Sequence, residues 1–94
     1  MLTTKDKMYL RKVANKMNAV FQIGHDGIND NMVRDILLHL EKNELMKVKF
    51  LETCPMSKDE IKEAFINEGI EIVQVIGHTF VLYLYSPECK NHVL

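Results

Sequence analysis

The stretch from Phe21 to Phe50 constrains the fold more than any other part of the chain, because its pattern changes three times. A short apolar run leads into Gly24, His25, Asp26 and Gly27, called the glycine loop below. An amphipathic segment and a second apolar run follow, which predicts strand, loop, helix and strand. A loop at a helix N-terminus presents backbone N–H groups and the positive end of the helix dipole. The glycine loop is therefore a candidate phosphate-binding site.

Three segments carry apolar residues at helical spacing behind residues that commonly cap helices. The second of them has Asn29 as its cap, and the third opens with Ser57 and Glu60 in a capping-box arrangement. The predicted helices run from Thr3 or Thr4 to about Lys16, from Asn29 to Asn43, and from Ser57 to Gly69. The predicted apolar faces are Leu10, Val13, Ala14 and Met17 in the first, Val33, Ile36, Leu37 and Leu40 in the second, and Ile61, Ala64 and Phe65 in the third.

Four strands are expected, over 19–23, 45–51, 72–76 and 79–85. The second alternates apolar residues with Lys47 and Lys49, so one face should be buried and the other should carry the lysines. The last two are apolar at nearly every position, which predicts cover on both faces, and Gly77 and His78 join them as a hairpin. Each strand–helix–strand unit predicts a parallel crossover, with the last strand antiparallel. If both crossovers proceed in one direction, the second and third helices share a face of the sheet.

Composition bounds the function classes. The 94 residues make one domain, with an irregular tail from about residue 87. The chain has neither a membrane-spanning apolar run nor a secretory signal, so Cys54 and Cys89 are expected to be reduced thiols in a cytoplasmic protein. The spacing of His39, His78 and His92 matches no metal-binding motif. No nucleophile–base pair is evident, so we expect no enzyme, no cofactor, no metal, no membrane contact and no small-molecule substrate.

The net charge is −1, but the first sixteen residues carry +4 and the remainder carries −5. At about 100° per residue, Lys5, Lys12 and Lys16 fall in one stripe of the first helix, and Arg11 is a further base of this segment. A lysine stripe of this kind is either a solvated helix face or a surface that contacts phosphates. The residues by themselves leave both interpretations open. The glycine loop likewise has two interpretations, an ordinary strand–helix turn and a phosphate contact.

The sequence also resembles a known family over nearly its whole length. The resemblance is carried by Leu10–Ala14, FQIGHDGINDNM at Phe21–Met32, ELMKVKF at Glu44–Phe50 and VQVIGHTFVLY at Val73–Tyr83. These segments are similar to the YhbY-like proteins, the free-standing bacterial form of the CRM domain (chloroplast RNA splicing and ribosome maturation). The resemblance implies an α/β fold of the two-layer α+β type, similar to the C-terminal domain of translation initiation factor three. It implies three helices in the order α-β-α-β-α-β-β and a mixed sheet with strand order 1-2-4-3.

The resemblance also implies RNA binding, and association with precursors of the large ribosomal subunit. Gly24 to Gly27 matches the family's GxxG loop, which is similar to the KH-domain loop that clamps an RNA backbone. That loop usually carries a basic residue between its glycines, where this chain has His25 and Asp26. The family often has a basic residue after the Leu-Tyr of its last strand, where this chain has Leu84.

Two hypotheses follow. In the first, the chain is an RNA-binding ribosome-assembly factor that uses the glycine loop with Lys5, Arg11, Lys12 and Lys16. In the second, it is a protein-interaction module on the same fold with weak or no RNA affinity, as its acidic remainder suggests.

Overall fold

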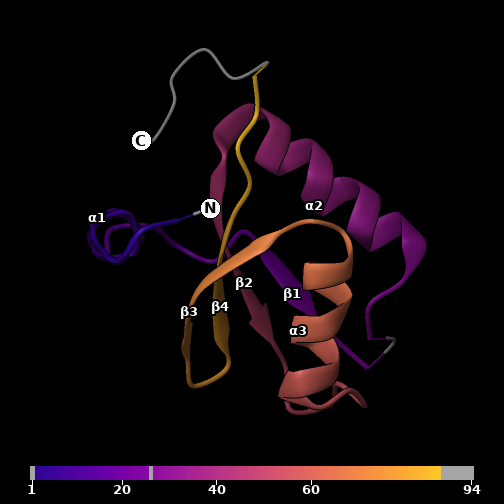
Figure 1. The fold of residues 1–94 in the computed structure, drawn as a ribbon. Coiled ribbons are helices and arrows are strands. Elements are labelled where there is room, and N and C mark those ends of the chain that lie inside the picture. The colour runs from indigo at the N-terminus through magenta and orange to yellow at the C-terminus, as the bar shows by residue number, and fades with distance from the viewer. Residues whose placement is uncertain (1, 26, 88–94) are drawn as a thin grey trace.

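The computed structural model describes residues 2–25 and 27–87, and its centre is a four-stranded mixed sheet (Figure 1). The strands are β1 (Phe21–Ile23), β2 (Leu45–Phe50), β3 (Glu71–Ile76) and β4 (Thr79–Tyr83). They lie in the order β1-β2-β4-β3, with β1 parallel to β2 and β4 antiparallel to both of its neighbours. Strand order, mixed character and chain topology are therefore as predicted.

Three helices complete the fold: α1 (Thr4–Ala14), α2 (Asp30–Asn43) and α3 (Lys58–Asn67). Each begins at a predicted cap. The Asn29 side chain accepts a hydrogen bond from the N–H of Met32 at 2.9 Å. Thr3 caps α1 and Ser57 caps α3, each in a reciprocal capping box. The partner of Thr3 is Asp6, so the one acidic residue of the basic N-terminal segment is held at the helix start.

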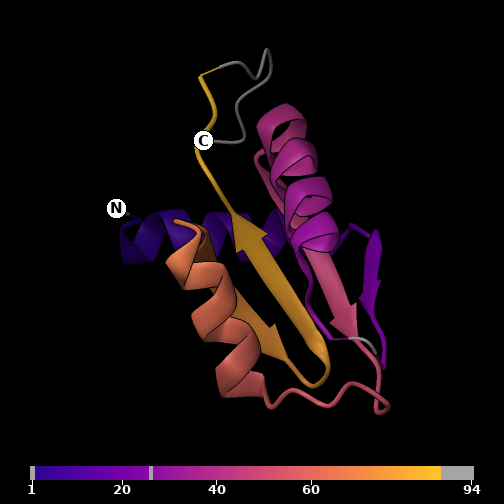
Figure 2. The same cartoon turned by 90° about the vertical axis from the view of Figure 1, so that its right-hand side faces the viewer.

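The helices cover both faces of the sheet, with α2 and α3 on one face and α1 behind the strands on the other (Figure 2). α2 and α3 share a face, as the two crossovers predicted. Their core consists of Ile23, Ile36, Leu40, Met46, Val48, Phe50, Ile61, Phe65, Ile70, Phe80 and Leu82. The core beneath α1 consists of Leu10, Ala14, Leu45, Val73, Val81 and Tyr83. α1 thus adds a partial third layer to the two-layer arrangement of sheet and paired helices.

β4 explains why the C-terminal hairpin is so apolar. It lies inside the sheet, and its side chains alternate between the two cores, with Phe80 and Leu82 on one side and Val81 and Tyr83 on the other. The prediction of cover on both faces is confirmed for β4. β3 is an edge strand instead, and only Val73 is buried among its residues, so its cover is partial.

Element boundaries differ from the predictions where short turns take over. α1 ends at Ala14, because the N–H groups of Lys16 and Met17 bond the carbonyls three residues earlier, at 3.1 and 2.9 Å. Lys16 therefore lies in a turn beyond the helix. β1 is shorter than the apolar run 19–23, since Val20 pairs with β2 through one hydrogen bond only. β4 ends at Tyr83 rather than at residue 85.

Glu44 joins three parts of the chain at the end of α2. It is fully buried and its backbone is left-handed, with φ of 63°. Its N–H donates to the Leu40 carbonyl at 2.7 Å, and its own carbonyl accepts from the N–H of Leu84 at 2.9 Å. Its carboxylate accepts from the N–H of Ser86 at 2.8 Å. One residue thus closes α2, directly precedes β2 and holds the segment that leaves β4.

Candidate nucleic-acid interface

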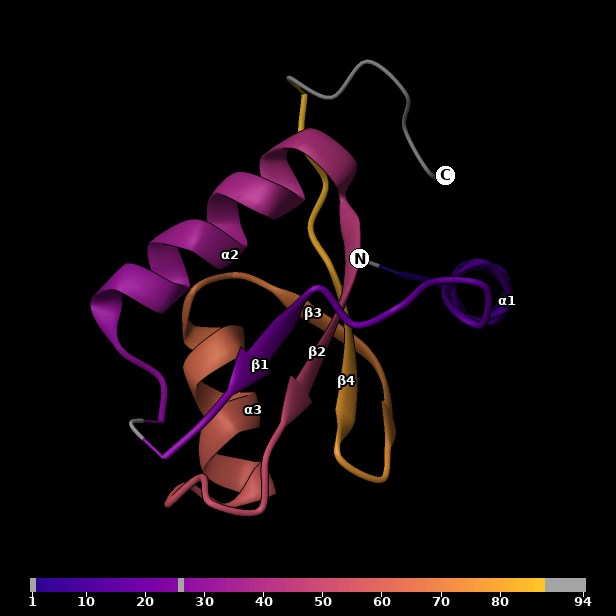
Figure 3. The ribbon, with the colours of Figure 1, turned by 180° about the vertical axis from the view of Figure 1, so that it is seen from behind.

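The glycine loop follows β1 at the end of the sheet and leads into α2 (Figure 3). The Leu51 N–H extends the β1–β2 pairing by donating to the Ile23 carbonyl at 2.8 Å. The turn is closed by the Gly27 N–H, which donates to the Gly24 carbonyl at 3.0 Å. The predicted strand–loop–helix order is therefore confirmed. Asp26 lies outside the described residues.

The two glycines of the loop have different surroundings. Gly27 is buried and has a positive φ of 67°, a conformation that favours glycine. A Cβ at Gly27 would stand 3.1 Å from the Met56 sulfur and 3.8 Å from Pro55 Cγ. Gly24 is half-buried without a positive φ, and a Cβ there would meet only Leu51, at 4.0 Å. The absence of a side chain at Gly27 thus makes room for the segment between β2 and α3. The space beside Gly24, by contrast, is open.

The start of α2 keeps part of its hydrogen-bonding capacity. The N–H groups of Ile28 and Met32 are engaged, the first with the Met56 sulfur at 3.4 Å and the second with the Asn29 cap. The N–H groups of Asp30 and Asn31 have no acceptor among the described residues. These two groups and the helix dipole favour a negative charge at this spot. His25, in the loop that precedes this helix, is exposed.

The predicted basic residues lie at the opposite end of β1. Lys5, Arg11 and Lys12 are exposed on α1, and Lys16 is exposed in the turn that follows it. This turn leads into the start of β1, whereas the glycine loop follows the end of β1. The structure therefore does not bring the α1 bases and the glycine loop into one pocket. α1 packs against β2, β3 and β4, and the same face of the sheet continues across β2 and β1 toward the loop (Figure 3).

Two further lysines stand on that face. Lys47 and Lys49 alternate with residues of the α2–α3 core, so their side chains lie on the same side as α1. The Lys47 ammonium donates to the carbonyl of Met17, just after α1, at 3.2 Å. Lys49 is exposed and lies opposite Gln22 of β1, close in register to Gly24. Strand alternation in the sequence placed these lysines on one face, and the docking of α1 places its exposed bases on the same side of the sheet.

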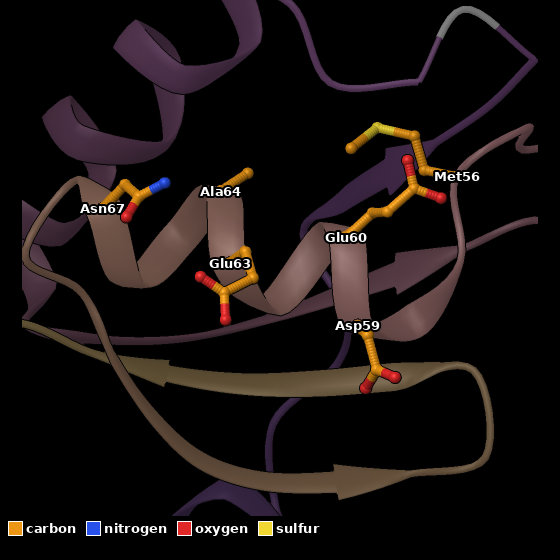
Figure 4. A pocket seen from close by; sticks show the side chains of 6 residues that line it. All are labelled: Met56, Asp59, Glu60, Glu63, Ala64 and Asn67. Atoms are coloured by element: carbon orange, nitrogen blue, oxygen red, sulfur yellow. The ribbon is translucent and has the colours of Figure 1, made fainter.

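A groove along α3 has the opposite character (Figure 4). Its lining residues are Met56, Asp59, Glu60, Glu63, Ala64 and Asn67. The three carboxylates would repel a phosphate backbone, so this side is a poor candidate for RNA contact. No group of three potential metal ligands occurs among the described residues. The helices of the described part are also too short or too polar to cross a bilayer.

Comparison with known proteins agrees with this architecture. Residues 2–83 match the model of the CRS1/YhbY (CRM) domain. The "Probable RNA-binding protein YqeI" of Bacillus subtilis is 43% identical over 92 residues, covering 97% of this chain and 96% of that protein. An "RNA-binding protein" of Haemophilus influenzae is 36% identical over 90 residues, covering 95% and 91%. The solution structure of the hypothetical protein SAV1595 from Staphylococcus aureus matches with a TM-score of 0.72 and 42% identity, over 94% of this chain and 93% of that one. The chain belongs to the CRS1/YhbY (CRM) domain family.

Proposed function

We propose that the protein binds RNA through the face of the sheet that carries α1, and that it acts in the bacterial cytoplasm on precursors of the large ribosomal subunit. The observation that carries this proposal is the placement of Lys47 and Lys49 between the bases of α1 and the glycine loop. The names of the Bacillus and Haemophilus relatives describe RNA binding, which supports the same class of ligand. The name basic face is used below for Lys5, Arg11, Lys12, Lys16, Lys47 and Lys49.

The two parts of this surface have different roles in the proposal. The basic face supplies charge, and each lysine that neutralises a phosphate releases a counterion and adds affinity without reading sequence. The glycine loop supplies shape, because a phosphate can approach Gly24 without meeting a side chain of that residue. The N–H groups of Asp30 and Asn31 at the start of α2 then face the same anion.

The salt dependence of RNA affinity tests the basic face. Lys12→Ala combined with Lys16→Ala is expected to weaken binding and to flatten the dependence of log K on log salt, by roughly 0.7–0.9 for each phosphate that is no longer neutralised. Lys58→Ala combined with Lys62→Ala removes the same charge from α3, outside the basic face, and serves as the control. Equal slopes for the two double variants would place the RNA elsewhere.

Cofractionation tests the ribosomal role separately from RNA affinity. On a sucrose gradient of a bacterial lysate, the protein is expected to migrate with large-subunit precursors and to leave those fractions after RNase treatment. The acidic groove along α3 favours a second candidate function, a protein-interaction module. Cofractionation that survives RNase, together with no RNA affinity of the purified protein at low salt, would support that second function instead.

A further inference from the structure

We propose that Met56 is a site of reversible oxidation, and that its sulfoxide displaces the glycine loop and lowers RNA affinity. Met56 lies between β2 and α3, far from the loop in sequence, yet its sulfur accepts the hydrogen bond of the Ile28 N–H at 3.4 Å. The same sulfur lies 3.1 Å from where a Cβ of Gly27 would stand. One thioether therefore supports the last residue of the loop and the residue after it. The effect on affinity rests on the proposed RNA contact of the loop, but the effect on loop structure does not.

Met56 differs from the other described methionines in that its sulfur contacts the glycine loop. Met17 and Met32 are also half-buried, but they pack against the two cores. Met56 is half-buried and lines the groove along α3, into which its side chain extends (Figure 4). A small oxidant can therefore reach its sulfur. Met46 is fully buried, and Met8 is 63% exposed on α1. Met8 should be oxidised at least as readily, but it does not touch the glycine loop, so it provides a natural comparison.

The chemistry needs only a peroxide. One oxygen atom passes from hydrogen peroxide to the thioether sulfur; the S–O bond forms as the O–O bond breaks, and water leaves. The sulfur is oxidised by two electrons and the peroxide is reduced by two. The product is a polar sulfoxide, which methionine sulfoxide reductases convert back to the thioether.

The sulfoxide does not fit the existing contact. An oxygen added on the side of Ile28 would fall inside the present distance between the N–H group and the sulfur, so the loop would have to move outward. The space toward Gly27 has no room for an added atom, because even a Cβ on Gly27 would stand 3.1 Å from the sulfur. An oxygen added toward the groove would place its partial negative charge near the three carboxylates that line it, which disfavours this position. Every position of the oxygen is therefore unfavourable within the present contact, so Gly27 and Ile28 are expected to shift at the entry to α2.

The test compares each protein with its own unoxidised form. Wild type, Met56→Leu and Met8→Leu are treated with hydrogen peroxide and then with dithiothreitol, which reverses the sulfenic acid or disulfide of Cys54 but leaves methionine sulfoxide in place. Affinity is measured with a ribosomal RNA fragment at low salt, and the amide signals of Gly27 and Ile28 are followed by NMR. Mass spectrometry confirms which methionines carry oxygen.

Oxidised wild type and Met8→Leu are expected to lose about threefold or more in affinity, the size of one weak hydrogen bond, and to shift both amide signals. Oxidised Met56→Leu should do neither, and reductase treatment should restore the wild type. An equal loss in Met56→Leu, or no shift of the amide signals in wild type, overturns the proposal. If unoxidised wild type binds no RNA, the proposed function fails, while the amide signals still decide whether Met56 controls the loop.

Discussion

At the scale of single residues, the two glycines that look equivalent in the sequence have separate roles. Gly27 is required by the protein itself, because its backbone is left-handed and its α-carbon faces Met56. Gly24 has neither constraint, so its missing side chain is not explained by folding. The simpler idea that both glycines leave room for a phosphate applies to Gly24 alone in this structure.

Alanine substitutions separate these roles. Gly27→Ala is expected to lower the free energy of unfolding by about 1–2 kcal/mol, because an L-residue must adopt the left-handed backbone and Met56 must give way. Gly24→Ala should stay within about 0.5 kcal/mol of wild type, as substitutions without steric conflict usually do. Urea unfolding measures both changes in the free energy of unfolding, provided that the variants and wild type have equal m-values. Equal costs for the two variants would contradict the geometry of the turn. Gly24→Ala is then the cleaner probe of RNA affinity, since the protein remains folded.

At the scale of elements, local signals determine where helices begin, and tertiary contacts determine where several elements end. The caps Thr3, Asn29 and Ser57 act through bonds three residues away, so their spacing in the sequence is sufficient. The end of α2 depends instead on Glu44, whose carboxylate reaches the segment after β4. A buried charge of this kind is tolerated because a backbone N–H donates to it.

Two substitutions at Glu44 distinguish its side chain from its backbone. Glu44→Ala should cost about 1.5–3 kcal/mol of stability, because the buried N–H of Ser86 loses a charged acceptor. Glu44→Gly loses the same bond but relieves the left-handed strain, so it should be less destabilising by about 1 kcal/mol. Chemical denaturation of the two variants gives the difference. A glycine variant no more stable than the alanine variant would show that the strain is absent.

At the scale of the whole molecule, the sheet separates two surfaces of different charge. α1 and the residues of the basic face lie on one side of the sheet. α3 and its acidic groove lie on the other side. This separation explains how a chain of net charge −1 can still offer a phosphate backbone a positive surface. Tyr83 lies in the core beneath α1, so the stability of the fold depends on the pH at which this phenol ionises.

Burial raises the pKa of Tyr83 from its ordinary value of 10.0, and the carboxylate of Glu44 adds to the effect. The folded protein therefore keeps this proton to a higher pH than the unfolded chain does. The stabilisation is fully present below pH 10 and is lost as the pH rises through the folded pKa. Tyr83→Phe should make the fall of stability above pH ~10 less steep, because the variant has no phenol to ionise at this position. Urea unfolding across this range checks the difference, and parallel curves for wild type and Tyr83→Phe would contradict it.

The sequence by itself determined the elements, their order and the direction of their pairing, because hydrophobic period, caps and glycine turns act over a few residues. It also separated Lys47 and Lys49 from the buried side of β2, since a strand alternates every residue. The position of α1 came only from the tertiary structure, because no crossover rule governs a helix that precedes the first strand. The surroundings of Gly27 also came only from the tertiary structure, because Met56 reaches it from a segment far away in the chain. The basic face depends on the docking of α1, and the support of the glycine loop depends on Met56, so both required the packed molecule.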